Sequence, residues 1–353
     1  MRKLIFKIHL LIALTTGTFL VLLGTTGSII AFEPELDRLL HPHLSYVSPV
    51  SEAPSLGQIS DAVSRHFVGE PIVAFLLPSS PDFSAQVVLP SGIVYVNQYT
   101  GEILGVRTRG QTFLGLARAL HVRLATGDVG KDILKWSAVA MLFSLASGFY
   151  LWWPLKRVRI RGAWRHRRFW FDLHHALGVF SLFPLFVLAV TGTIIGFEDQ
   201  ATRLINKQPG STKLNITQTS TQTEPTPGAT PITPDEAVAI ARAEMPGTIP
   251  YRVQMPRFGG LYRVSLRSSQ DRIMSDSNSV AVDPYSGKVI SSVGSRDSSI
   301  VQRILAVNEA IHTGNVFGIP SRILVSLASI TLPLQAFSGL LMWLRRNKIL
   351  LED

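Results

Sequence analysis

The chain has 353 residues, a formal net charge of +10, 46% hydrophobic residues and no cysteine. Only 16% of the residues are charged, which excludes an ordinary soluble protein of this length and indicates a membrane protein. The lack of cysteine excludes disulfides, iron–sulfur clusters and thioether-linked haem. The basic residues flank apolar stretches, whereas nucleic-acid-binding proteins gather them on a soluble surface.

The first predicted element is the apolar stretch Leu10–Phe32, which follows a short N-terminus of residues 1–9. About 20 apolar residues suffice to cross a bilayer as a helix. Arg2 and Lys3 precede the stretch, as in a signal peptide, but the apolar run is too long and no small-x-small cleavage site follows. We therefore expect a retained transmembrane helix.

Residues 33–133 are predicted to form a small α+β domain outside the membrane. Ser55 and Gln58 form a capping box that opens an amphipathic helix. Alternating strand-like runs follow, and the sequence NQYTGEIL from Asn97 is typical of a hairpin in which Gly101 supplies the left-handed residue.

The rest of the chain repeats this order of elements. A capping box at Thr233 and Glu236 and a hairpin sequence DPYSGKVI, with Gly287 at its turn, mark a second outer domain. Its first part is rich in Ser, Thr, Pro and Gln and predicts a flexible linker. The predicted segments are the second span 134–153, a basic loop 154–175, the third span 176–197, the second outer domain 198–321 with its linker 208–231, the fourth span 322–344 and a C-terminal tail 345–353.

The distribution of Lys and Arg predicts the orientation. The short segments 1–8, 154–172 and 345–353 hold 13 basic residues in 36 positions, whereas 33–133 and 198–321 hold 19 in 225. By the positive-inside rule, the short segments and both termini are cytoplasmic and the two long segments lie outside. The predicted location is the inner membrane of a bacterium.

An internal duplication is visible when the spans are aligned. The run from Phe6 to Glu33 aligns without a gap to the run from Phe171 to Glu198, at an offset of 165 residues. The second span aligns with the fourth at an offset of 191. The aligned pairs include Thr26-Gly27 with Thr191-Gly192, Ser147-Gly148 with Ser338-Gly339, His9 with His174, and His121 with His312.

The chain resembles the PepSY-associated transmembrane helix family, often called iron-regulated membrane proteins. The motifs that carry the resemblance are Asp172-Leu173-His174, Thr191–Glu198, Ala119–Gly127, Ile311–Gly314 and the sequence SGLLMW in the fourth span. The resemblance implies a four-helix membrane bundle with a two-fold internal repeat and two small extracytoplasmic α+β domains of the PepSY type. Some members of the family are similar to inner-membrane ferric-siderophore reductases that carry b-type haem.

Four of the nine histidines recur at aligned positions, and a cofactor on a pseudo-two-fold axis is held by equivalent residues. With the resemblance, this predicts two bis-histidine haems, one ligated by His9 and His174 near the inside and one by His121 and His312 near the outside. One haem cannot serve both faces, since His9 to Phe32 spans about 35 Å of helix. His175 adjoins His174 at about 100° around the helix, so at most one of them faces a given haem, and the alignment favours His174.

Other residues have both a functional and a structural interpretation. Glu33 and Glu198 could assist proton or cation handling near the outer haem, or only end their spans. Glycines in the first and third spans could make room for a macrocycle or serve helix packing. They are Gly17, Gly24, Gly27, Gly178, Gly192 and Gly196.

The predicted function is haem-mediated electron transfer across the membrane that reduces a ferric siderophore on the periplasmic side. Four arginines of the second outer domain could attract an anionic chelate, or form a solvated strand face: Arg252, Arg257, Arg263 and Arg267. The donor, cytoplasmic or a quinol, stays open because the chain has no G-x-G-x-x-G dinucleotide motif.

Two other functions remain. A membrane-anchored PepSY module that binds an extracytoplasmic protein explains the outer domains but not four symmetric histidines. A transporter of iron chelates needs a polar site in mid-membrane, which the spans do not offer.

Overall fold

The computed structural model describes residues 1–50, 55–108, 112–154, 158–206, 230–256, 260–268, 278–294 and 300–346. The chain forms two compact units. The first is helical and comprises residues 1–33, 113–209 and 308–353; the second contains the β-sheet and comprises residues 34–112 and 210–307. The predicted linker 208–231, apart from its last two residues, lies outside the described part of the chain.

In the described part of the first unit, four helices are long and apolar enough to cross a membrane. They are α1 (Arg2–Ile30), α6 (Asp128–Trp152), α7 (Arg167–Asn206) and α10 (Ile319–Arg346). The four predicted spans therefore correspond to four helices. Each helix begins several residues before its predicted span, because the apolar run marks the membrane core and not the last hydrogen-bonded turn.

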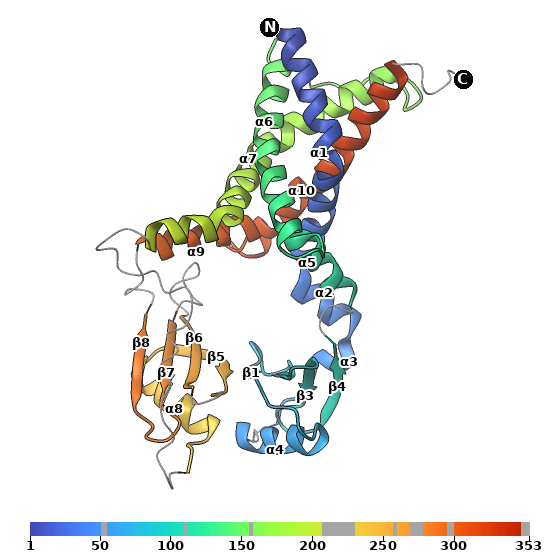
Figure 1. Cartoon of the computed structure of the whole chain (residues 1–353). Coiled ribbons are helices and arrows are strands. Elements are labelled where there is room, and N and C mark those ends of the chain that lie inside the picture. The colour runs from blue at the N-terminus through green and yellow to red at the C-terminus, as the bar shows by residue number, and fades with distance from the viewer. Residues whose placement is uncertain are drawn as a thin grey trace. The chain divides into compact units, whose positions relative to one another are not determined.

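The four long helices pack side by side, with α1 and α7 each in contact with both α6 and α10 (Figure 1). A Cβ atom on Gly24 of α1 would lie 2.5 Å from the backbone oxygen of Ser329 on α10, and one on Gly196 of α7 would lie 2.9 Å from Cβ of Lys135 on α6. These two glycines thus serve close helix packing. Ser28 and Ser326 add hydrogen bonds from each hydroxyl to the other's carbonyl oxygen, at 3.0 and 3.1 Å.

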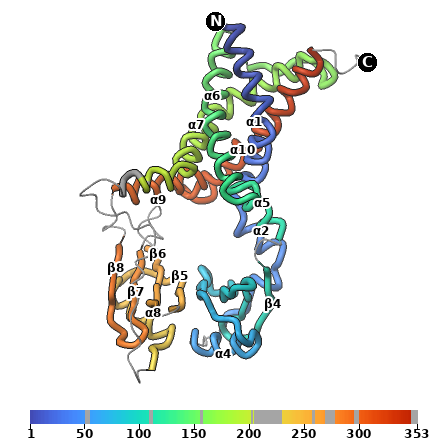
Figure 2. Tube along the Cα trace, viewed as in Figure 1, coloured from blue at the N-terminus to red at the C-terminus, as the bar shows by residue number. Residues whose placement is uncertain are grey.

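The start of α1 and the end of α10 lie at the same end of this helical unit (Figure 2). The end of α6 lies there too, since Arg2 donates a 2.8 Å hydrogen bond to the backbone oxygen of Leu151. Arg345 near the end of α10 donates to the backbone oxygen of Arg165 at 2.5 Å. This end is strongly basic, and we call it the N-terminal end of the bundle.

Two shorter helices, α5 (Phe113–Arg123) and α9 (Ile300–Thr313), carry His121 and His312. Helix α5 packs against α1 and α6. The turn from α9 to α10 needs Gly314, which has φ of 75°, and a Cβ there would lie 2.9 Å from Cα of Arg322. His121 then lies against Thr26 of α1, and His312 against Thr191 of α7.

The second unit contains one antiparallel sheet of eight strands in the order β4-β3-β2-β1-β5-β6-β7-β8. The strands are β1 (Ala74–Leu76), β2 (Ala85–Val88), β3 (Ile93–Val96), β4 (Ile103–Arg107), β5 (Thr248–Gln254), β6 (Tyr262–Ser268), β7 (Asn278–Val282) and β8 (Val289–Val293). The central pair joins β1 to β5, with Phe75 opposite Val253. The predicted outer domains thus share one sheet, and residues 113–133 and 308–321 belong to the helical unit.

Helices α4 (Leu56–His66) and α8 (Pro234–Glu244) contribute to the apolar core of the sheet through Ile59, Val63, Ala237 and Ala241. Both predicted capping boxes are confirmed. Gly101 and Gly287 have the positive φ angles expected at the hairpins, 72° and 67°. The Asp235 carboxylate accepts hydrogen bonds from the backbone N–H groups of Leu56 and Gly57, at 2.8 and 2.9 Å, and so ties α4 to α8.

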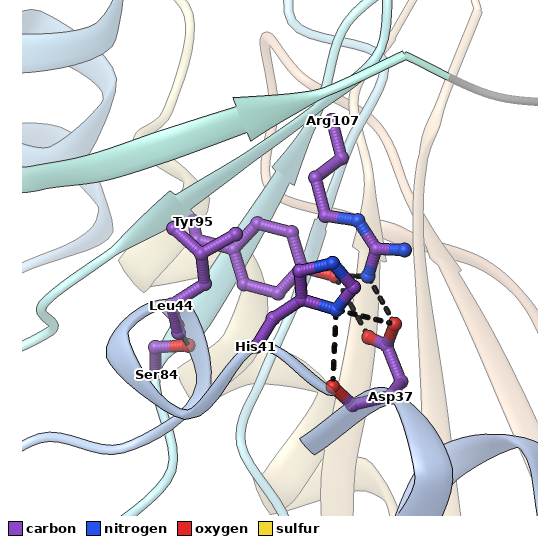
Figure 3. A network of polar contacts seen from close by, with 6 residues as sticks. All are labelled: Asp37, His41, Leu44, Ser84, Tyr95 and Arg107. Atoms are coloured by element: carbon purple, nitrogen blue, oxygen red, sulfur yellow. Dashed lines mark hydrogen bonds and ion pairs between the residues drawn. The ribbon is translucent and has the colours of Figure 1, made fainter. Parts of the chain in front are cut away.

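The short helices α2 (Glu33–Leu40) and α3 (Pro42–Ser45) join the sheet through a polar network (Figure 3). Asp37 forms an ion pair with Arg107 of β4 and accepts a 3.2 Å hydrogen bond from the hydroxyl of Tyr95. His41 Nδ1 lies 3.3 Å from the backbone oxygen of Asp37. Burial and the neighbouring Asp37 raise the pKa of Tyr95, which keeps this hydroxyl a hydrogen-bond donor.

Candidate functional site

The four aligned histidines lie in the helical unit at two levels of the bundle. His9 on α1 and His174 on α7 form the first level, close to the N-terminal end. His121 on α5 and His312 on α9 form the second level. Along α1, from His9 to the Thr26 that contacts His121, the two levels are about 26 Å apart.

At the second level, the structure brings the predicted pair together. The ring centres of His121 and His312 are 6.4 Å apart and the rings are inclined by 48°. Nδ1 of His121 lies 3.1 Å from Oγ1 of Thr26 on α1, and Nδ1 of His312 lies 2.9 Å from Oγ1 of Thr191 on α7. Burial lowers the pKa of both histidines to about 4, so each ring is neutral at pH 7, the form that binds metals.

At the first level, the contacts follow the same pattern with serine in place of threonine. Nδ1 of His9 lies 2.9 Å from Oγ of Ser147 on α6. Nδ1 of His174 lies 3.0 Å from Oγ of Ser338 on α10. His174 and His175 have their ring centres 6.2 Å apart, and His9 and His174 are both held from a neighbouring helix at this level.

His175 lacks this kind of anchor. Its Nδ1 donates a 2.7 Å hydrogen bond to the backbone oxygen of Phe171 on its own helix, and its ring centre lies 4.1 Å from that of Phe171, with the rings inclined by 49°. His174, in contrast, is held from a second helix, which distinguishes the two neighbours as the alignment did.

A backbone carbonyl group identifies the protonated nitrogen of one of these rings. Nδ1 of His174 lies 3.1 Å from the carbonyl oxygen of Gln335, three positions before Ser338. A carbonyl oxygen only accepts, so the proton of His174 is on Nδ1. Nε2 of that ring then keeps its lone pair for a ligand.

A glycine lies beside each of the four rings and directly follows the anchoring hydroxyl residue. A Cβ on Gly27 would lie 2.9 Å from Cε1 of His121, and one on Gly192 would lie 3.1 Å from Cε1 of His312. The matching distances are 3.4 Å from Gly148 to His9 and 3.5 Å from Gly339 to His174. The duplication showed these dipeptides as recurring, but nothing in the sequence assigned them to the histidines.

An apolar layer separates the two levels. Its buried side chains come from all four long helices: Leu20, Met141, Leu185, Ala189 and Ala328. Such a layer excludes water between the levels. Charge transfer from one level to the other would therefore not be accompanied by a continuous path of water.

The two carboxylates considered with the second level have different surroundings. Glu33 forms an ion pair with Arg118 of α5, whose Nε donates at 2.8 Å, three residues before His121. Glu198 is half-buried near Lys131, while the neighbouring Asp199 forms the ion pair with that lysine. Glu33 therefore helps to hold α5 in place.

The histidine pairs differ from a metal site built wholly from protein ligands. Among the described residues, no group of three or more His, Asp or Glu side chains could hold a metal ion. Two histidines facing one space fit a metal whose other ligands come from a cofactor, as in a haem.

A search of curated proteins gave no match. The model of the family described as the PepSY-associated TM region matches residues 6–346, which include all four long helices, both histidine levels and the whole sheet. The chain therefore belongs to the PepSY-associated TM region family.

Proposed function

We propose that this protein carries electrons across the bacterial inner membrane through two b-type haems and reduces ferric siderophores outside it. One observation carries the proposal: four histidines on different helices lie at two levels, each with Nδ1 held by a hydroxyl of another helix and with no hydrogen bond to Nε2 among the described residues. A residue that only lines a membrane interface needs no such anchor. The internal duplication of the chain accounts for the recurrence of the same arrangement.

The second level supports the fit of a haem. His121 and His312 would hold the iron of such a haem, since metal–nitrogen bonds of about 2 Å to both rings fit ring centres about 6 Å apart. The ring centres of His121 and His312 are 6.4 Å apart. Because the chain has no cysteine, the haem would be held without thioether bonds, as a b-type haem is.

The haem supplies a one-electron couple between ferric and ferrous iron. The chain's own residues bind and orient this group and exclude water. The histidines ligate, the serines and threonines orient them, and the apolar layer between the levels keeps water out. The electron donor at the first level is a cytoplasmic reductant or a membrane quinol.

The orientation rests on the basic end of the bundle. Arg2, Arg165 and Arg345 gather at the N-terminal end, which the positive-inside rule assigns to the cytoplasm. His9 and His174 are then the inner ligands and His121 and His312 the outer ligands. The sheet unit is extracytoplasmic and consists of two PepSY-like halves.

The sheet supplies a surface for an anionic chelate. Arg252 and Arg263 lie on neighbouring strands, and their side chains point away from the face that packs on α4 and α8, since Val253 and Val264 point toward it. The guanidinium of Arg267 lies 5.1 Å from the ring centre of Tyr251. The fourth candidate, Arg257, lies outside the described residues.

Reduction outside the membrane suits this substrate. A ferric chelate is too polar and bulky to enter the apolar bundle, whereas an electron can reach it from the outer histidine level. Ferrous iron is held less tightly than ferric iron by the hard oxygen ligands of a siderophore. Reduction therefore releases the metal.

The experiment that tests the proposal uses the protein in sealed vesicles after reduction with dithionite. A ferric siderophore added from outside should reoxidise the haem and yield ferrous iron that ferrozine traps. The gallium chelate, which cannot be reduced, should have no effect, and His121→Ala should abolish the transfer. Haem that no ferric chelate reoxidises would refute the reductase, and a protein without haem would favour a PepSY module that binds an extracytoplasmic protein.

A further inference from the structure

Each of the four histidines is held by the same two groups. A serine or threonine hydroxyl faces Nδ1, and a glycine faces Cε1. The hydroxyl residues are Thr26, Ser147, Thr191 and Ser338, and the glycines are Gly27, Gly148, Gly192 and Gly339. We call each hydroxyl residue with its following glycine a clamp.

The hydroxyl groups also have a hydrogen-bond acceptor on their own helix. Thr191 Oγ1 lies 2.8 Å from the carbonyl oxygen of Val187, and Ser147 Oγ lies 2.7 Å from that of Phe143. A hydroxyl has one proton, and these carbonyl oxygens offer it an acceptor on the residue's own helix. With the proton donated there, the hydroxyl oxygen accepts the Nδ1 proton of the histidine.

The clamp also explains why glycine follows the hydroxyl residue. The two residues are adjacent on the helix surface, so a ring held at Nδ1 by the first has its Cε1 edge against the second. At Gly27 and Gly192 a Cβ would lie only 2.9 and 3.1 Å from the ring carbon. A larger residue would push the ring off the hydroxyl.

We infer that the four clamps are the positioning residues of the haem ligands: they hold the proton on Nδ1, aim Nε2 at the iron and make the imidazole more electron-donating. The inference rests on the proposed function. An acceptor on Nδ1 makes the imidazole a stronger ligand of the metal. Because ferric iron gains more from that donation than ferrous iron, each clamp favours the ferric state of its haem.

The test compares three variants on α7. Thr191→Val removes the hydroxyl with little change of shape, Thr191→Ser keeps it, and Thr193→Val removes a hydroxyl that bonds only within the helix, to the backbone oxygen of Ala189 at 2.7 Å. The haem ligated by His312 is identified from the spectral component that His312→Ala removes. Its midpoint potential and its low-spin spectrum are measured in each variant.

With Thr191→Val, the ratio of ferrous to ferric iron in that haem should rise about fivefold at a fixed redox poise, since one hydrogen bond is lost. The other haem should not change. Thr191→Ser and Thr193→Val should both behave as the wild type. A Thr191→Val protein with unaltered potential and spectrum, or one that shifts no more than Thr193→Val, would overturn the inference.

A second readout needs no haem and separates the inference from the proposed function. Nitrogen NMR of the histidine rings in the haem-free full chain distinguishes the two tautomers, with signals assigned from single histidine variants. The inference expects His9, His121, His174 and His312 to carry the proton on Nδ1. The proton on Nε2 in these rings would refute the clamps even if haem is bound, whereas Nδ1 protonation in a protein that never binds haem would support the clamps and refute only the reductase.

Discussion

Replacement of Gly27 by alanine displaces the ring of His121 without replacing a proposed haem ligand. The new Cβ would lie 2.9 Å from Cε1 of His121, whereas two carbon atoms pack at about 3.5 Å or more. The ring must therefore withdraw by about 0.6 Å. The distance from Nδ1 to Oγ1 of Thr26, now 3.1 Å, then lengthens to at most about 3.7 Å, which weakens or breaks the hydrogen bond.

The expected result is a loss of cofactor affinity without a loss of fold. Loss of such a hydrogen bond to a metal-ligating histidine costs about 10- to 100-fold in metal affinity, so the Gly27→Ala protein should be purified with the haem of the second level depleted. Its thermal stability without haem should not fall, because alanine is favoured over glycine within a helix by up to about 1 kcal/mol.

Gly17→Ala is the matched control, since this position lies on the same helix and a Cβ there would meet no atom within 4 Å. Haem content from the pyridine haemochrome and thermal unfolding in detergent are measured for both variants. A Gly27→Ala protein with a full complement of haem and an unchanged spectrum would show that the ring does not depend on the clamp.

Three further outcomes are expected. Alkaline phosphatase fused at Lys213 should be active and at Asp353 inactive; the reverse activities would contradict the orientation. His121→Ala or His312→Ala should deplete the spectral component of one haem, and His9→Ala or His174→Ala that of the other. His41→Ala, His43→Ala and His66→Ala should deplete neither. Depletion of the same component by variants of both pairs would disprove the pairing. Asp235→Ala should lower the free energy of unfolding of the sheet unit by about 2 kcal/mol, because two hydrogen bonds to a carboxylate are lost. Asp61→Ala, at an exposed position of α4, should leave it unchanged. Equal melting temperatures of the two variants would refute the role of Asp235 in tying α4 to α8.

Local patterns in the sequence predicted many of the elements. The four spans could be predicted because an uninterrupted apolar run of about 20 residues is typical of a helix that crosses a membrane. The capping boxes at Ser55 and Thr233 and the turns at Gly101 and Gly287 depend on neighbours within a few residues, and all four are present. The four histidines could be predicted as a group because they recur at aligned positions of the two halves of the chain.

Contacts between distant segments were not predictable in this way. Alternating residues identify the faces of a strand but not its neighbour, so the pairing of β1 with β5 that joins the two predicted outer domains could not be foreseen. The contact of Ser147 with His9 spans 138 residues, and that of Ser338 with His174 spans 164. Gly24 and Gly27 look alike in the sequence, yet the first packs against α10 and the second against a histidine ring.

The visible spectrum of the purified full chain, recorded before and after dithionite, tests the central claim most directly. The proposed electron carrier should show a Soret band that shifts on reduction together with the sharp visible bands of a low-spin b-type haem, and the amount should approach two haems per chain. A protein that is folded and has an intact sheet but no Soret band, even after expression with added haem, would contradict haem-mediated electron transfer.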